Sequence, residues 1–282
     1  MASNTLIVGE VTITAVKDIP RMPSNPLVIY PGVVAEQLEP HRHWLNERGH
    51  MQLTVGSFLL RSAGKTLLVD TGIGKRPSTV FRTEEADLLG NLAVHGVHQD
   101  DVDLVVNTHL HGDHVGWHTV AQGEAWVPTF PRARYLVQSV EWQYFTAPER
   151  RDTGYVPECL LPIEAAGQLD LVDQEYRITP DLTYIPTPGH TPGHVAILVQ
   201  SRGERALLIG DAAHHPIQLM EPGWNMRGDL DPEQAAQTRH ALAEWVEKEG
   251  FPVMGAHFPF PCMGRVVRLK DSRVWQGIEL ES

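Results

Sequence analysis

The feature that most constrains this chain is a set of four short apolar runs that each lead into metal-binding side chains. The runs span 103–108, 182–186, 205–210 and 252–256. The side chains beyond their ends are His109, His111, Asp113 and His114, then His190 and His194, then Asp211, and finally His257. Runs of this length predict buried strands, and layered α/β folds assemble their sites in the loops beyond strand ends. The sequence therefore predicts one site built from four separate segments.

The first of these segments carries enough ligands to begin two metal sites. His109 and His111 are two residues apart, so in an extended backbone their imidazoles point the same way and can bind one ion. Asp113 and His114 follow the flexible Gly112 and can turn toward a second ion. A lone histidine is usually an ordinary core or surface residue, but four buried polar groups without partners would cost several kcal/mol. Coordination of a metal is the ordinary way to hold such a cluster.

Hydrophobic periodicity and turn residues predict strands that alternate with helices along the 282 residues. Strands are predicted over 5–16, 51–61 and 66–70, with a hairpin turn between the last two. Helices are predicted over 84–95 and 232–249, the second with Asp231 as its N-cap and Gly250 at its end. We expect a single domain over 1–282. The stretch 18–49 has four early prolines and no clean period, so we expect a lid or a dimerisation loop there.

Composition excludes several classes of protein. The chain is 42% hydrophobic and 21% charged, which is the balance of a globular protein and not of a disordered or fibrous one. A net charge of −12 repels phosphate backbones and anionic lipid surfaces, so neither nucleic acid nor a membrane is an expected partner. The only cysteines are Cys159 and Cys262, which excludes a disulfide framework. No basic segment followed by an apolar run opens the chain, and we expect a cytoplasmic location.

The order of the ligands resembles the signature of the metallo-β-lactamase-fold superfamily, His-x-His-x-Asp-His followed by a distant His, an Asp and a last His. The similarity extends from the segment 68–72 to Val267 and implies an α/β (α+β) fold, an αββα four-layer sandwich with a binuclear site at one edge. Asp70 matches an acidic position that orients a ligating imidazole in this family. His190 matches no ligand and is interpreted as structural. Carried over residue by residue, the resemblance implies one ion held by His109, His111 and His194, another by Asp113, His114 and His257, and Asp211 as the bridge.

Differences from several branches of the superfamily limit which of its enzymes the chain resembles. Secreted β-lactamases lack the bridging aspartate that Asp211 supplies here, and the nuclease branches need an extra domain and basic surfaces. Glyoxalase II-like thioesterases have a basic segment after the last histidine, whereas the segment 258–264 has none. The chain looks like the quorum-quenching lactonases and the methyl parathion hydrolase-like enzymes, which share an Asp-x-x-Tyr or Asp-x-x-His segment. Here that segment ends in His214, which is closer to the parathion hydrolase pattern.

The resemblance implies a binuclear metal-dependent hydrolase that opens a lactone or cleaves a carboxylic ester. Two divalent ions, zinc or else manganese, iron or cobalt, would lower the pKa of a bridging water toward about 7, so that a hydroxide attacks the carbonyl carbon. Asp113 or His214 would handle the proton; alternatively, His214 orients the substrate oxygen or is structural, and His215 points away. Phosphotriester hydrolysis is the nearest alternative activity, followed by glyoxalase II-like or persulfide dioxygenase-like activity.

The expected substrate is small, neutral and hydrophobic. Five aromatic residues, near the ligands or in the stretch 18–49, predict an apolar wall for the pocket, and the alternative is that they belong to the core. These residues are Tyr30, Trp44, Trp117, Trp224 and Phe260. Because lactonase-like relatives are often dimers, the resemblance also implies a homodimer.

Overall fold

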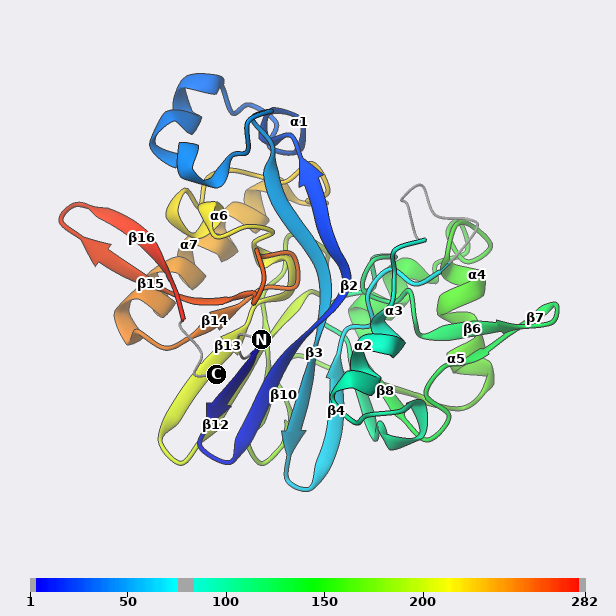
Figure 1. Ribbon diagram of the computed structural model, residues 1–282. Helices are drawn as coiled ribbons and strands as arrows, with labels where there is room; N and C mark the ends of the chain where they lie inside the picture. Colours follow the sequence, from blue (N-terminus) through cyan, green and yellow to red (C-terminus); the bar gives the residue numbers. More distant parts are fainter. Residues whose placement is uncertain (1–3, 76–83, 279–282) are drawn as a thin grey trace.

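A seven-stranded sheet forms the first half of the structure (Figure 1). The structure is a computed structural model that describes residues 4–75 and 84–278. In order across the sheet, the strands are Thr5–Val8 (β1), Val11–Ser24 (β2), Met51–Ser62 (β3), Lys65–Val69 (β4), Leu104–Val106 (β5), Arg134–Gln138 (β8) and Leu169–Val172 (β9). The pairs from β1 to β4 are antiparallel, and the pairs from β4 to β9 are parallel.

A second seven-stranded sheet lies against the first. In order across it, the strands are Tyr176–Thr179 (β10), Leu182–Pro186 (β11), Val195–Ser201 (β12), Glu204–Leu208 (β13), Val253–Met254 (β14), Met263–Leu269 (β15) and Ser272–Gly277 (β16). Only β13 and β14 are parallel neighbours in this sheet. A separate hairpin, Thr119–Gln122 (β6) and Ala125–Pro128 (β7), projects from the side of the molecule (Figure 1).

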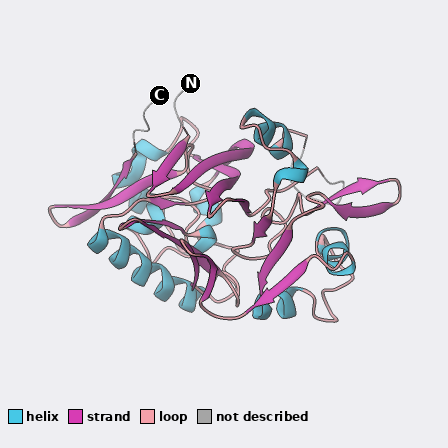
Figure 2. Cartoon of the chain, turned by 90° about the horizontal axis from the view of Figure 1, so that it is seen from below, coloured by secondary structure: helices cyan, strands magenta, loops and turns pink. Residues whose placement is uncertain are grey.

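Helices cover the outer faces of both sheets (Figure 2). The α-helices are Pro26–Ile29 (α1), Leu88–Val94 (α2), Ser139–Phe145 (α3), Val156–Cys159 (α4), Leu161–Ala165 (α5), Ile217–Met220 (α6) and Pro232–Glu249 (α7). Three 3₁₀ segments complete the described chain, namely Ala35–Trp44 (η1), Gln99–Asp101 (η2) and Gly210–Ala212 (η3). None of the described helices has the length and apolarity to cross a lipid bilayer.

Alternation along β3 and β4 explains the layered arrangement. Successive side chains of a strand point to opposite faces, and both faces are apolar here. Phe58 and Leu67 point into the core between the two sheets, together with Ile197 of β12. Leu59 and Leu68 point to the other face, where they pack in the cluster that includes α2. A sheet buried on both faces needs a covering layer on each, so the predicted αββα sandwich is confirmed.

The last helix forms where its local signals place it. The Asp231 side chain accepts a hydrogen bond from Gln234 N at 3.0 Å, and Pro232 occupies the first turn. Gly250 ends the helix in the left-handed region at φ 67°. Both predicted bounds of this helix are confirmed, whereas the helix predicted over 84–95 is shorter and spans Leu88–Val94.

Two predictions for the N-terminal part are wrong. The strand predicted over 5–16 is two strands joined by a turn at Gly9, whose φ is 56°. The stretch 18–49 is not wholly irregular, because β2 continues through Pro20 and Pro23 to Ser24. Pro20 lies within two register shifts of the ladder between β2 and β3, from Lys17 to Met22, and prolines are accepted at such irregularities, whereas Pro23 is paired with Gln52 beyond them. The excursion out of the sheet is therefore confined to the region of α1 and η1.

Candidate metal centre

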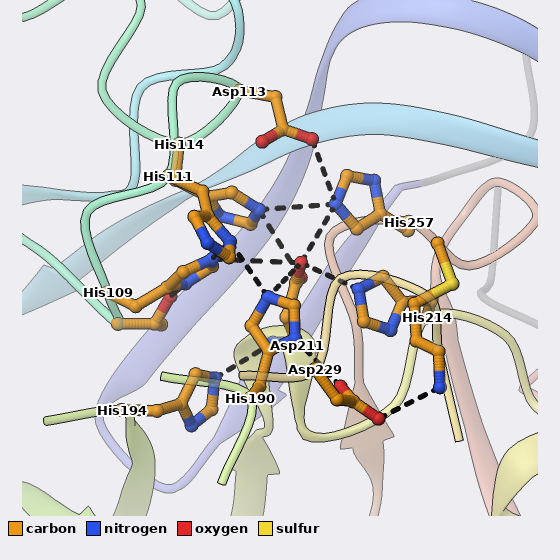
Figure 3. Close-up of polar contacts among 12 residues, drawn as sticks. His109, His111, Asp113, His114, His190, His194, Asp211, His214, Asp229 and His257 are labelled. Atoms are coloured by element: carbon orange, nitrogen blue, oxygen red, sulfur yellow. Dashed lines mark hydrogen bonds and ion pairs between the residues drawn. The ribbon is translucent and has the colours of Figure 1, made fainter. Parts of the chain in front are cut away.

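The four predicted segments meet at one edge of the sandwich. Three of them belong to the second sheet: the loop between β11 and β12, the segment η3 directly after β13, and the turn after β14. The fourth is the loop after β5 of the first sheet. Figure 3 shows their imidazole and carboxylate groups converging from different strands toward Asp211. The prediction that the ends of these strands assemble one site is confirmed.

Three imidazoles form the first donor group. Nε2 of His109 lies 3.1 Å from Nδ1 of His111, and that same Nδ1 lies 2.9 Å from Nε2 of His190. The three rings come from two different sheets, and their nitrogens all lie within 4.8 Å of one another. Imidazole nitrogens that face one another at this spacing form a site that an ion can bind.

The second donor group mixes two imidazoles with a carboxylate. Nε2 of His257 lies 3.2 Å from Nε2 of His114 and 3.5 Å from Oδ2 of Asp113. Nδ1 of His257 donates to the backbone oxygen of Thr54 at 2.8 Å, which leaves Nε2 directed at the group. Burial of both rings is nearly complete, and the Asp113 side chain is 26% exposed.

Asp211 lies between the two donor groups (Figure 3). Its Oδ2 lies 3.3 Å from Nε2 of His257 and 3.4 Å from Nε2 of His190. Its Oδ1 lies 3.3 Å from Nε2 of His114. One buried carboxylate therefore contacts ligand candidates of both groups, which is the geometry expected of a bridging residue.

The electrostatics of the site favour a cation. Burial alone would raise the pKa of Asp211, but the imidazoles of His114 and His257 hold that pKa well below its usual range. Burial, followed by repulsion from His190, lowers the pKa of His111 to about 3. Burial opposes the charged form of His257 as well, but Asp211 outweighs it and raises that pKa to about 8. The carboxylate of Asp211 thus attracts positive charge into the buried site, and a divalent ion that binds there would displace the proton from His257.

Asp70 supports His114 from behind the site. Its Oδ2 lies 2.9 Å from Nδ1 of His114 and accepts a hydrogen bond from the Thr108 hydroxyl at 2.7 Å. Its Oδ1 accepts from Thr108 N at 2.8 Å. Asp70 adopts φ 56°, an uncommon conformation for a residue with a side chain. The contact with His114 is the one that the family resemblance implies for this carboxylate.

The assignment of His194 as a ligand is wrong. Its Nε2 accepts a hydrogen bond from Asp211 N at 3.0 Å, and its Nδ1 faces the backbone oxygen of Thr187 at 3.1 Å. Both ring nitrogens are therefore used to hold the protein backbone. The approach is so close that a Cβ at Gly210, which has φ 50°, would lie 2.7 Å from Nε2 of His194. His194 fixes the start of η3, and it belongs to none of the groups that could hold an ion.

His190 takes the place that was given to His194. Its Nδ1 lies 2.9 Å from Oδ1 of Asp229, which turns Nε2 toward His111 and Asp211. The sequence interpretation of His190 as structural is therefore wrong. The two histidines are four residues apart in one loop, and the ring nitrogen of His190, not one of His194, faces the donor groups.

His214 joins the site on the side of Asp211. Its Nε2 lies 3.0 Å from Oδ2 of Asp211, and its ring is parallel to that of His257, with centroids 5.5 Å apart. The adjacent His215 turns the other way, and its ring contacts Trp44 edge-on at 4.8 Å. The expectation that His215 points away from the site is confirmed. His214 can reach a molecule beside Asp211.

A cavity of about 470 Å³ opens beside the donor groups. Six imidazole and carboxylate side chains line it, namely His111, Asp113, His190, Asp211, His214 and His257. The rest of the lining is mostly aliphatic and includes Met22, Pro23, Ile29, Leu53 and Met226, which come from β2, α1, β3 and the loop before α7. A pocket of this size with an apolar wall and a polar end suits a small ligand.

The predicted aromatic wall is wrong, because none of the five aromatic residues is among the described residues that line this cavity. Tyr30 and Trp224 are buried against each other, with ring centroids 5.8 Å apart. Trp117 is buried and donates from Nε1 to Asp18 at 2.9 Å. Trp44 covers His215, and Phe260 contacts Lys17. The apolar wall itself exists, but unbranched and branched aliphatic side chains supply it.

Two acidic residues of the site were not found from the sequence. Asp229 holds His190, and Glu141 of α3 holds two of the loops. Oε1 of Glu141 accepts from Leu110 N at 3.0 Å, and Oε2 accepts from Gly193 N at 2.8 Å. Glu141 lies three residues after β8 and Asp229 lies in the loop before α7, and no spacing in the sequence connects either carboxylate to the ligands.

The αββα sandwich and the histidine and aspartate donors at its edge define a metal-dependent hydrolase. The chain belongs to the metallo-β-lactamase superfamily, because the family description "Metallo-beta-lactamase superfamily" matches residues 52–257.

Curated proteins and solved structures extend this likeness. The chain is 27% identical over 214 residues to N-acyl homoserine lactonase AiiA of Bacillus thuringiensis subsp. kurstaki, which covers 71% of this chain and 79% of that protein. It is 25% identical to the crystal structure of the hydrolase AbOPH of the beta lactamase superfamily, with a TM-score of 0.84 and coverage of 100% and 99%. The fold is also that of AidC, a dizinc quorum-quenching lactonase solved with the product N-hexanoyl-L-homoserine, at 20% identity, a TM-score of 0.83 and coverage of 99% and 98%.

Proposed function

We propose that this hydrolase opens lactones and that N-acyl homoserine lactones are its substrate class. The observation that carries the proposal is the position of Asp211 between two donor groups, beside a cavity with an aliphatic wall. The curated relative AiiA is an N-acyl homoserine lactonase, which supports the choice of substrate class. An acyl chain suits the aliphatic wall, and a lactone ring suits the polar end.

We assign the ligands from the observed donor groups. One ion would be held by His109, His111 and His190, a second by Asp113, His114 and His257, and Asp211 would contact both. The donor set is imidazole and carboxylate, which fits zinc and neighbouring divalent metals. When bound, such ions activate water at neutral pH and polarise a carbonyl group.

The side chains that line the cavity have separate tasks. Met22, Leu53 and Met226 bind the apolar part of the substrate and exclude water from it. Asp113 lines the cavity with a partly exposed carboxylate, and it accepts the proton of the attacking water and returns it to the leaving oxygen. His214 orients the substrate oxygen next to Asp211.

Four further features stay predictions from the sequence: zinc as the metal, a homodimer, a cytoplasmic location, and a lid or dimerisation role for the stretch 18–49 within a single domain. Both cysteines are buried and neither is part of a disulfide, which agrees with a reducing compartment.

The first test is a substrate panel at known metal content. Protein stripped of metal is expected to be inactive toward N-hexanoyl homoserine lactone and to regain turnover when zinc, manganese or cobalt is restored. At equal metal loading, kcat/KM for the lactone is expected to exceed that for an aryl phosphotriester by at least about tenfold, or about 1.4 kcal/mol of transition-state stabilisation. A phosphotriester that is the better substrate at equal loading would contradict the proposal.

The second test concerns His214. The substitution His214→Phe keeps a ring beside His257 but removes the nitrogen that faces Asp211, and we expect a kcat that is lower by about 100-fold. Metal content, measured by elemental analysis, is expected to stay at the wild-type value. The matched control is His215→Phe, whose ring contacts Trp44, and wild-type turnover is expected there. Equal losses in the two variants would show that His214 has no special role.

A further inference from the structure

The imidazole of His190 is held from behind by a buried carboxylate. Nδ1 of His190 lies 2.9 Å from Oδ1 of Asp229, and the side chain of Asp229 has no exposed surface. An imidazole that donates from Nδ1 to a carboxylate presents the lone pair of Nε2 on its other side. In this structure that side faces His111 and Asp211.

Asp229 is itself held by groups of the chain. Its Oδ2 accepts a hydrogen bond from Met226 N at 2.8 Å and lies 3.4 Å from Nη2 of Arg239. Arg239 belongs to α7, and it has the largest side chain among the fully buried residues of the described chain. A buried arginine therefore balances the charge of the carboxylate that orients His190.

The same guanidinium also fixes the backbone beside Asp211. Nη1 of Arg239 donates to the oxygen of Ala212 at 2.9 Å, and Nε donates to the oxygen of Pro222 at 3.0 Å. Nη2 donates to Oδ1 of Asn225 at 2.8 Å. Ala212 directly follows Asp211, and Asp229 contacts His190. The side chain of Arg239 therefore holds a neighbour of each of these two site residues without itself belonging to the site.

The distances from Asp229 to its two partners indicate that it positions His190 and does not only balance the charge of Arg239. If Asp229 served only as the counter-charge of Arg239, its closest ionic contact would be the guanidinium. The imidazole nitrogen is closer, at 2.9 Å against 3.4 Å. Glu141 differs from Asp229, because its two oxygens accept hydrogen bonds from backbone N–H groups of the ligand loops and not from a ligand imidazole.

We propose that Asp229 and Arg239 form a positioning pair that keeps Nε2 of His190 free to bind an ion and so sets the affinity for that ion. This inference rests on the proposed function, since it takes His190 as a ligand. The pair does not contact the cavity, so its effect on turnover would pass through the metal.

The test is the substitution Asp229→Asn, which keeps the shape of the side chain. An amide can rotate so that its NH₂ faces Nδ1 of His190, which forces the proton onto Nε2 and blocks coordination. In zinc titrations against a competing chelator, we expect one ion to bind about 10- to 100-fold more weakly and the other to keep its affinity. The absorption spectrum of the cobalt-loaded variant is expected to differ from that of the cobalt-loaded wild type.

The matched control is Asp231→Asn. Asp231 lies two residues away, its side chain caps α7 through Gln234 N, and it belongs to none of the donor groups. We expect wild-type zinc affinity and a wild-type cobalt spectrum for this control. Zinc affinities that are equal in the Asp229→Asn variant, the Asp231→Asn variant and the wild type would overturn the proposal.

A second variant covers the case in which Asp229→Asn does not fold. Arg239→Lys keeps a buried positive charge but loses most of the guanidinium hydrogen bonds. We expect the same ion to bind about tenfold more weakly, and unchanged affinity would overturn the positioning role. Wild-type protein that binds no zinc would refute the proposed function, whereas wild-type protein that binds two ions would leave these variants to decide on the pair.

Discussion

Replacing His190 with alanine is expected to remove one of two bound ions and to lower kcat/KM by more than about 100-fold. Loss of a residue that merely orients a metal ligand already costs about 10- to 100-fold, so loss of the ligand itself should cost more. His190 shares its donor group with His109 and His111, so its loss would leave that ion only two imidazoles and the carboxylate that Asp211 shares with the other ion. Elemental analysis and steady-state kinetics on the same preparation measure both effects.

The control is His194→Ala in the same loop. We expect this variant to retain both ions, because neither ring nitrogen of His194 is available for coordination. It should instead lose about 1–3 kcal/mol of stability, since Asp211 N would be left buried without its acceptor. The reverse pattern, in which His194→Ala loses the ion and His190→Ala keeps it, would restore the assignment made from the sequence.

The sequence could not separate these two histidines. Both lie in the segment Gly-His-Thr-Pro-Gly-His, and either one satisfies the order of ligands in the family signature. Their roles depend on partners elsewhere in the chain: Asp229 is 39 residues from His190, and the amide that uses His194 belongs to Asp211. No local pattern contains that information, because the loop conformation is set by tertiary contacts.

Other features of the site could be predicted because they are local. Apolar runs predicted the strands β5, β11 and β13, and the side chains just beyond these strands form the site. The cap at Asp231 and the left-handed glycine at Gly250 fixed the bounds of α7 in the same way. In each case the signal and the structure involve neighbouring residues.

The pocket wall could not be predicted, because it depends on which strands meet at the site. Met22 and Leu53 reach the cavity as cross-strand partners in the ladder of β2 and β3. The prolines of this region suggested an irregular loop, although β2 continues past Pro20 through register shifts and past Pro23 in regular pairing. The aromatic residues were expected at the pocket because of their position in the sequence, but Trp117 and Tyr30 pack into the core.

Replacing Arg239 with methionine is expected to cause the largest loss of stability among these variants. The substitution leaves the carboxylate of Asp229 buried without its cationic partner, which typically costs about 3–5 kcal/mol. It also removes the donors for Ala212 O, Pro222 O and Asn225 Oδ1. Methionine fills a similar length of space, so the effect should come from the lost charge and hydrogen bonds and not from a large cavity.

Urea unfolding of the metal-free protein measures this loss without a contribution from bound ions. The control is Arg42→Met, which removes an exposed ion pair with Glu39 on η1 and is expected to leave the unfolding midpoint nearly unchanged. If Arg239→Met were as stable as that control, the buried arginine would not be needed to balance Asp229. Because Asp229 orients His190 and Ala212 follows Asp211, a marked loss would show that the last helix stabilises the fold through the same contacts that hold the metal site.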